Sequence, residues 1–290
     1  MKHRRLVTPA PIAALALLIA AVSGSAQSID SPFPPHKVAG NLYYVGSNML
    51  AAYLITSDQG HVLINACYKE TVPLIRASVE KLGFRFQDIK ILLNSHAHND
   101  HCAGSAEIRR LTGCRVMVMK GDAELIRAGG KGDFQYDEPR HHYEACPVDR
   151  VLSDGDRVRL GGNDLVAHST PGHTRGCTTW TMQVRDGGKT LNAVIIGSPN
   201  VNPGYRLVNN TAYPEIAKDY QKCFRVLKSL PVDLFLGAHG AYYDLPAKHA
   251  RLLQKPEENP FVDRVGYRRY VADRETAFLQ EWKRQREETK

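Results

Sequence analysis

The chain has 290 residues, of which 43% are hydrophobic and 23% are charged, and its formal net charge is +8. These proportions are typical of a globular protein and exclude a disordered, collagen-like or coiled-coil chain. The basic surplus is spread out and forms no basic stripe with interleaved aromatic residues, so nucleic acid is not expected as a partner. A chain of this size buries about three quarters of its unfolded surface, so a metal ion would serve chemistry rather than folding.

The N-terminus has the layout of a secretory signal peptide over residues 1–26. A basic stretch (residues 2–5) precedes an apolar run (residues 11–22), and small residues follow up to Ala26. The apolar run is too short for a membrane span, which takes about 20 residues. We therefore expect cleavage after Ala26 and export to the periplasm. The mature chain, residues 27–290, is expected to be a single domain, monomeric and without stable membrane association.

The first half of the chain alternates strand-like and helical patterns. Short apolar or alternating runs, several of them bounded by glycine, predict strands at residues 42–45, 52–56, 61–65, 89–93 and 115–119. Apolar residues at helical spacing predict a helix at 70–82, which ends at Gly83, and a second helix at 104–111.

The second half contains two predicted hairpins followed by helices. Glycine-containing turns separate strand-like runs at residues 156–160 and 165–170, and at 179–184 and 191–196. A buried strand is predicted at 234–236, and helices are predicted at 213–230, 247–253 and 267–283. Each half of the chain thus combines strands with helices. This pattern predicts an α/β fold in which two sheets pack together with helices on both outer faces.

Six cysteines follow the predicted signal peptide. An exported protein meets an oxidising compartment, so a disulfide bond is expected, although the sequence cannot choose among the possible pairings. Each thiol could equally remain free and pack as a small buried side chain. The six are Cys67, Cys102, Cys114, Cys146, Cys177 and Cys223.

The sharpest motif lies directly after the predicted strand at 89–93. Four side chains that can bind a metal stand within six residues, at His96, His98, Asp100 and His101. His96 and His98 project to the same side of an extended chain and can share one metal ion. Asp100 and His101 stand where a turn would aim them at a second ion, about 3.5–4 Å from the first. Imidazole together with carboxylate favours zinc among the common metals.

Two further histidines stand in similar settings, after predicted strands and beside glycines that allow tight turns. His173 lies in a Pro-Gly-His-Thr run and His239 in a Gly-Ala-His-Gly run. The remaining histidines lack this placement and are interpreted as ordinary surface or core residues.

The order H-x-H-x-D-H, P-G-H-T and G-x-H at strand ends resembles the metallo-β-lactamase superfamily over the chain from about Val38 onward. The resemblance implies the αββα sandwich of that family, with two mixed sheets, and two zinc ions as cofactors. The first zinc would be bound by His96, His98 and His173. The second would be bound by Asp100, His101 and His239.

Many members of this superfamily carry an aspartate that bridges the two metals, at the end of the strand before the last histidine. No Asp or Glu occurs in residues 187–214 of this chain, and the corresponding strand end reads Gly197-Ser198. A serine there, with Asp-His-His at the second zinc and no cysteine ligand, resembles the third subclass of the zinc β-lactamases.

The resemblance implies an antibiotic-resistance hydrolase that opens the amide bond of penicillins, cephalosporins and carbapenems with a metal-activated hydroxide. Asp100 would orient the hydroxide, and Tyr205 is a candidate hydrogen-bond donor to the developing oxyanion. Ser198 and Asn200 are the candidates for binding the substrate carboxylate.

Two alternatives stay open at this stage. The first is a superfamily hydrolase that acts on another cyclic ester or amide, such as a lactone. The second is a zinc-binding module without catalytic activity, against which an open coordination position would argue, because structural zinc sites are closed.

Overall fold

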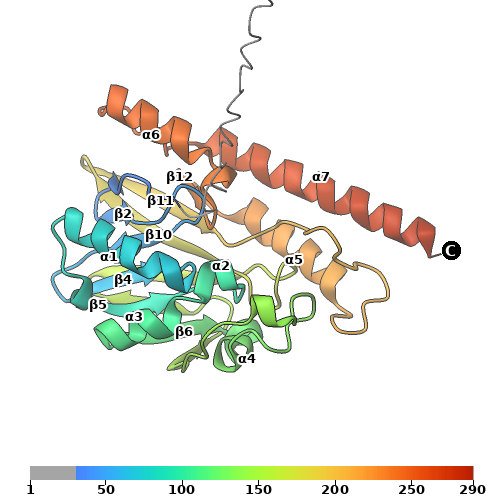
Figure 1. The fold of residues 1–290 in the computed structure, drawn as a ribbon. Helices are drawn as coiled ribbons and strands as arrows, with labels where there is room; N and C mark the ends of the chain where they lie inside the picture. Colours follow the sequence, from blue (N-terminus) through green and yellow to red (C-terminus); the bar gives the residue numbers. More distant parts are fainter. Residues whose placement is uncertain (1–30, 290) are drawn as a thin grey trace, which may run out of the picture.

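The computed structural model describes residues 31–289 and consists of two β-sheets packed face to face (Figure 1). Helices cover the outer face of each sheet, so the predicted αββα sandwich is confirmed. The predicted signal peptide (residues 1–26) lies outside the described residues. Within residues 31–289, no helix combines the length and the apolar character that a membrane crossing requires.

The first sheet contains seven strands in the order of the sequence. They are β1 (His36–Ala39), β2 (Leu42–Tyr44), β3 (Tyr53–Ile55), β4 (His61–Ile64), β5 (Ile89–Leu93), β6 (Arg115–Met119) and β7 (Arg150–Leu152). Strands β1 to β4 pair antiparallel, whereas β4 to β7 pair parallel. The parallel pairs need crossover connections, which are supplied by α1 (Val72–Lys81), α2 (Asn99–Cys102), α3 (Ser105–Thr112) and α4 (Lys120–Ala128).

The second sheet contains five strands in the order β12-β11-β10-β9-β8. Their bounds are β8 (Arg157–Leu160), β9 (Asn163–Ser169), β10 (Thr178–Asp186), β11 (Lys189–Ile196) and β12 (Leu234–Gly237). Three further helices follow, α5 (Ile216–Ser229), α6 (Leu245–Gln254) and α7 (Arg264–Glu288). Helices α5 and α7 lie side by side against this sheet (Figure 1). Short 3₁₀ turns lie between these elements, at η1 (Lys69–Thr71), η2 (Phe86–Asp88), η3 (Pro139–His141) and η4 (Gly240–Tyr242).

The central strands are buried on both faces, and their alternation divides the core into two clusters. In β5, Ile91 and Leu93 face the second sheet, whereas Leu92 faces the layer of α1, α3 and α4. In the second sheet, Trp180 pairs with Ile195, and the Trp180 indole N–H donates to the Asn94 carbonyl just after β5 of the first sheet. Phe224 of α5 belongs to the same cluster as both residues. A strand between two apolar layers reads as a continuous apolar run, which is why 89–93 could be predicted.

The expectation of a disulfide bond is wrong for this structure. None of the six cysteines forms a disulfide bond, and all six are buried. Cys102 donates its thiol hydrogen to the His98 carbonyl, and the Cys177 sulfur accepts the Ser198 backbone N–H at 3.1 Å. The thiols therefore pack as small apolar side chains with weak hydrogen bonds.

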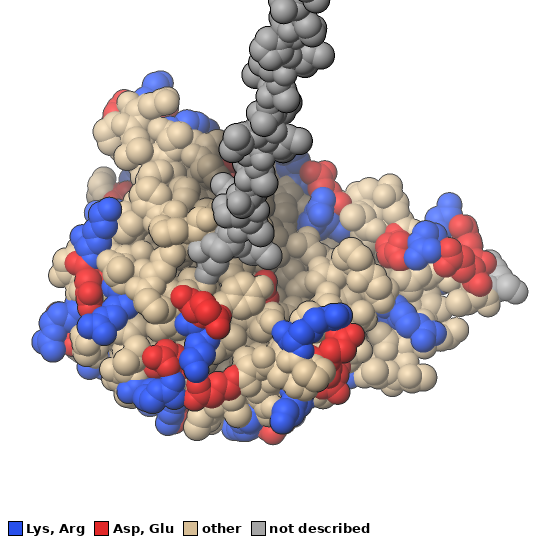
Figure 2. All heavy atoms as spheres, in the orientation of Figure 1, with Lys and Arg blue, Asp and Glu red and all other residues tan. Residues whose placement is uncertain are grey.

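Charged side chains of both signs are interspersed over the face shown in Figure 2. Many form ion pairs along helices, such as Arg284 with Glu281 and Glu288 on α7. This face therefore carries no concentrated basic stripe of the kind that nucleic acid requires.

Candidate metal centre

Three loops from distant parts of the chain meet at one edge of the sandwich. The first follows β5 and carries the motif at residues 96–101, the second follows β9 and carries His173, and the third follows β12 and carries His239. Strands β9, β11 and β12 all run in the same direction, so their carboxyl ends reach the same edge of the second sheet. A hydrogen bond from the Thr178 N–H to the Ser95 carbonyl, at 2.7 Å, joins that edge to the loop after β5.

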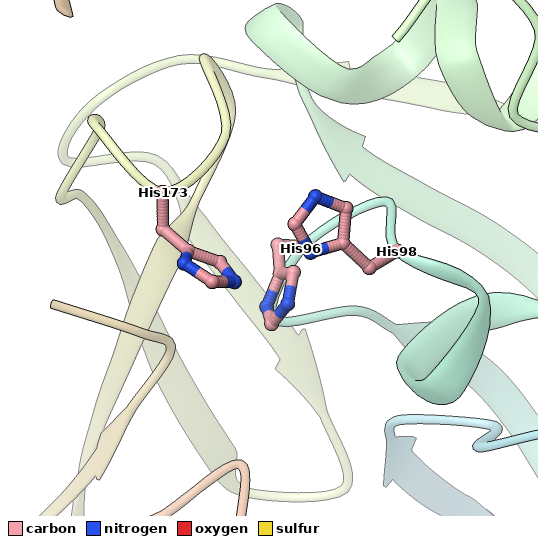
Figure 3. Close-up of side chains that lie close together, drawn as sticks. All are labelled: His96, His98 and His173. Carbon is pink, nitrogen blue, oxygen red and sulfur yellow. The ribbon is translucent and has the colours of Figure 1, made fainter. Parts of the chain in front are cut away.

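His96, His98 and His173 form a buried group of three imidazoles (Figure 3). Their ring centroids lie 4.7–4.8 Å apart, and one ligand atom of each lies within 4.8 Å of the others. Contacts on the Nδ1 atoms leave Nε2 available in two of these rings. His173 Nδ1 lies 2.9 Å from the Asn200 carbonyl oxygen, and His96 Nδ1 lies 3.2 Å from the Ser95 hydroxyl.

Asp100, His101 and His239 converge beside this group. The Nε2 atoms of His101 and His239 lie 3.0 Å apart, and an Asp100 carboxylate oxygen lies 3.2 Å and 3.5 Å from them. Tetrahedral zinc with bonds of about 2.0–2.1 Å separates its ligand atoms by about 3.4 Å. The spacing of these three atoms therefore fits a zinc ion. The predicted six-residue set is brought together as two adjacent groups.

The protonation states suit metal binding. Burial, reinforced by the neighbouring imidazoles, lowers the pKa of His96 well below its ordinary value and that of His173 to about 3. Burial likewise lowers the pKa of His98 to about 4 and that of His239 to about 3. These rings are neutral at pH 7 and present unprotonated nitrogens.

Asp100 is ionised in the same setting. Burial alone would raise the pKa of Asp100, but the neighbouring His101 and His239 outweigh it and hold this pKa below the ordinary range. Neutral imidazoles with one carboxylate form a donor set that suits zinc. The residues therefore fit the metal that the motif predicts.

The two groups stand at the floor of an open cavity of about 660 Å³, a size that accommodates a small organic molecule. Among the described residues, Arg140 is the only lysine or arginine in its wall. The other polar wall residues include Asp100, Asp133, Tyr136, His141, Asn200, Asn202 and Tyr242.

The structure places only one of the two predicted substrate-binding residues in the cavity wall. Asn200 lines the cavity, but Ser198 is fully buried and its hydroxyl lies 3.2 Å from the Tyr242 hydroxyl. Ser198 therefore does not face the cavity directly, contrary to the expectation. Its backbone N–H donates to the Cys177 sulfur, and its hydroxyl contacts the Tyr242 hydroxyl.

Tyr205 also departs from the expectation. Its hydroxyl donates a hydrogen bond to the His173 carbonyl at 2.8 Å, and the ring is buried against Phe134 outside the cavity wall. With its proton used in this way, Tyr205 supports the His173 loop and is not placed to stabilise an oxyanion.

Several residues of the site were not found from the sequence. Tyr242, three residues after His239, lines the cavity and contacts both Ser198 and Asn200. Its nearness to His239 along the chain was the only available signal.

Asp122 on α4 is the second. Its buried carboxylate accepts hydrogen bonds from the Ala97 N–H, the Gly176 N–H and the Thr174 hydroxyl, at 2.7–2.8 Å. It thereby joins the loop that carries His96 and His98 to the loop that carries His173. Nothing in the sequence marked this residue, because α4 itself was not predicted.

A further buried carboxylate stands behind His98. Asp133 Oδ2 lies 3.9 Å from His98 Nε2, and both atoms lack a hydrogen-bond partner among the described residues. Carboxylates placed behind metal-binding imidazoles orient the ring and raise its basicity.

Comparisons with known proteins agree with this geometry. A sequence model described as the metallo-beta-lactamase superfamily matches residues 48–239. The native FEZ-1 metallo-beta-lactamase from Legionella gormanii is 51% identical, with a TM-score of 0.87, over 89% of this chain and 98% of that one. BJP-1 from Bradyrhizobium japonicum, a subclass B3 metallo-beta-lactamase, is 34% identical, with a TM-score of 0.84, over 90% of this chain and 98% of that one.

Curated proteins of a different activity are also similar. A hydroxyacylglutathione hydrolase from Cereibacter sphaeroides is 28% identical over 68% of this chain and 64% of its own length. One from Rhodospirillum rubrum is 32% identical over 35% of this chain and 31% of its own length. The matched segments thus span less than two thirds of these relatives.

Proposed function

The chain is a hydrolase of the metallo-β-lactamase superfamily, and we propose that it is a zinc-dependent β-lactamase that cleaves the amide bond of penicillins, cephalosporins and carbapenems. The single observation that carries the proposal is the strand end after β11. There the buried Ser198 stands where a bridging aspartate characterises the thioester and lactone hydrolases of the superfamily. The 51% identity to a β-lactamase over nearly its whole length supports the same reading.

We further propose two zinc ions as cofactors, one in each histidine group, and export of the mature chain to the periplasm as a monomer. When bound, such a zinc pair polarises a substrate carbonyl and lowers the pKa of water from 15.7 to about 7. Metal analysis of the purified protein should find two zinc ions per chain.

The residues of the chain supply orientation and proton control. The ionised Asp100 carboxylate accepts a hydrogen bond from the attacking water and fixes its direction at the centre. Tyr136, whose ring lies 5.1 Å from that of His98, takes the role first expected of Tyr205. Its oxygen accepts a hydrogen bond from the Asn202 amide at 3.0 Å, and burial raises its pKa, so its proton remains to be donated to the substrate carbonyl oxygen.

A panel of substrates tests the proposal. The zinc-loaded protein is assayed with a carbapenem, a cephalosporin, a homoserine lactone and a hydroxyacylglutathione thioester, with and without a chelator. We expect kcat/KM on at least one β-lactam to exceed that on the lactone and the thioester, and the chelator to abolish turnover. Absence of β-lactam turnover in the zinc-loaded protein would refute the proposal.

Matched variants accompany the panel. His98→Ala removes a proposed zinc ligand and should abolish turnover. His168→Ala removes a histidine of β9 that contacts Thr181 outside the centre, and it should retain turnover.

The thioester hydrolases among the curated relatives make glutathione thioesters the second candidate substrate. A higher kcat/KM on the thioester than on every β-lactam would favour that function.

A further inference from the structure

We propose that the Tyr242 hydroxyl donates a hydrogen bond to the carboxylate of the substrate, an inference that rests on the proposed β-lactamase function. Tyr242 ends the η4 turn, three residues after His239, and the two rings lie 5.1 Å apart. Both residues line the cavity, as does Asn200. The phenol therefore stands in the cavity wall beside the group formed by Asp100, His101 and His239.

With Ser198 as a donor, the hydrogen bonds around the phenol leave its proton available to the cavity. A phenol oxygen offers one proton and can accept hydrogen bonds. The Asn200 side-chain nitrogen donates to the Tyr242 oxygen at 3.0 Å. The Ser198 hydroxyl lies 3.2 Å from the same oxygen and is itself within 3.5 Å of the Asn200 backbone N–H. Either hydroxyl can donate in the contact between them, and we take Ser198 as the donor to the phenol, while its oxygen accepts from the backbone. The phenol then has no acceptor among these neighbours and can donate into the cavity.

The phenol is rigidly held and stays protonated. Its ring stacks on Tyr270 with centroids 5.1 Å apart, and a Cβ on Gly237 would come within 2.7 Å of the ring, so only glycine fits beneath it. Burial is the main cause that raises the pKa of Tyr242 above its ordinary value. A rigid, protonated donor loses little entropy when a substrate binds.

The substrates of the proposed reaction carry a carboxylate that can accept this hydrogen bond. In penicillins, cephalosporins and carbapenems the carboxylate stands on the carbon next to the ring nitrogen. If the ring nitrogen faces the group that contains His239, the carboxylate lies on the side of the cavity where Tyr242 and Asn200 stand. Arg140, the one lysine or arginine among the described residues of the cavity wall, adds a favourable potential for an anion, which its ion pair with Glu138 reduces.

The test compares zinc-loaded wild type with Tyr242→Phe on a β-lactam acid and on its methyl ester. A hydrogen bond to a charged group corresponds to about 10- to 100-fold in affinity. We expect KM for the acid to rise at least about 10-fold, with kcat changed less than about 3-fold. For the ester, which lacks the anion, we expect a rise in KM of less than about 3-fold. An unchanged KM for the acid, or equal rises for acid and ester, would overturn the inference.

Further measurements exclude a structural explanation. Tyr267→Phe removes a buried hydroxyl that donates to the Leu227 carbonyl, far from the cavity wall, and should leave both KM values unchanged. Calorimetric titration with the hydrolysed product, which keeps its carboxylate, should show an affinity at least about 10-fold weaker for Tyr242→Phe, and an equal affinity would also overturn the inference. Failure of the wild type to hydrolyse any β-lactam would instead refute the proposed function, and the inference with it.

Discussion

At the scale of single residues, the side chains of the centre have the protonation states that binding a cation requires. Four imidazoles are kept neutral by burial, and one carboxylate is kept ionised by the imidazoles beside it. The protein thereby gives up favourable hydration of these groups, and it recovers that free energy when a metal ion binds.

This arrangement predicts acid sensitivity of the metal-free protein. A lowered histidine pKa means that the unfolded chain binds protons between about pH 6.5 and 3 that the native chain does not. The free energy of unfolding should therefore fall as the pH drops through this window, by up to about 1.4 kcal/mol per pH unit for each histidine. Urea denaturation of the chelated protein at pH 7, 5.5 and 4.5 measures this, and a flat profile would contradict the prediction.

The sequence pointed to the proposed ligands more readily than to the residues around them. The six proposed ligands could be found because histidines after strand ends form a recognisable order. Ser198 and Tyr205 were placed near the site, but the direction of each side chain depends on packing that the order of residues does not reveal. Tyr242 could not be selected because its role depends on contacts with Ser198 and Asn200, residues more than 40 positions away.

At the scale of secondary structure, α4 connects the loops of the centre. Its carboxylate at Asp122 accepts hydrogen bonds from both the loop after β5 and the loop after β9. Burial is the main cause that raises the pKa of Asp122, to about 6, while its three hydrogen bonds oppose the rise. Gly176 allows this close approach, since a Cβ there would lie 2.3 Å from the Asp122 nitrogen.

Asp122→Asn is predicted to loosen both loops. The amide nitrogen would face a backbone N–H or the Thr174 hydroxyl, so at least one buried donor loses its acceptor, at a cost of about 1–3 kcal/mol. Because the histidines lose their support, zinc affinity should fall about 10- to 100-fold. Equilibrium competition with a chromophoric chelator measures that affinity.

A matched control separates the two effects. Asp233 is also buried, and it accepts hydrogen bonds from the Asn192 backbone and side chain at 2.8–2.9 Å, away from the cavity. Asp233→Asn should destabilise the fold without changing zinc affinity. Equal losses of zinc affinity in both variants would show that Asp122 acts only through global stability.

The sequence predicted most of the strands, but it missed β7 and the helix α4. Apolar or alternating runs anticipated β2 to β6 and β8 to β12, because these strands bury one or both faces. The strand β7 has three residues and two exposed side chains, so it lacks a readable pattern. Helix α4 follows β6 without a break and begins Lys120-Gly121 with no side-chain cap, so no start signal marks it.

At the scale of the whole molecule, the centre is attached to a fold with its own core. One cluster lies between the sheets and extends under α5 and α7, and the other lies beneath α1, α3 and α4. The two groups of proposed metal ligands lie at the edge of the sandwich where these layers end. Neither hydrophobic cluster therefore depends on a metal ion for its packing.

Removal of zinc should therefore abolish hydrolysis and leave the fold in place. We expect the chelated protein, and the His98→Ala and Asp100→Ala variants, to keep the far-ultraviolet circular dichroism of the native chain. Bound zinc should still raise Tm, since a ligand at 100 times its Kd adds about 2.7 kcal/mol of stability. Loss of helical signal on chelation would contradict this prediction.

We propose that the loops after β5, β9 and β12 form one centre for two metal ions. Anomalous diffraction at the zinc absorption edge from crystals of the zinc-loaded protein tests it most directly. We predict two peaks, one among His96, His98 and His173 and the other among Asp100, His101 and His239. A single peak, or a peak elsewhere with either group empty, would show that the two groups do not bind two metal ions.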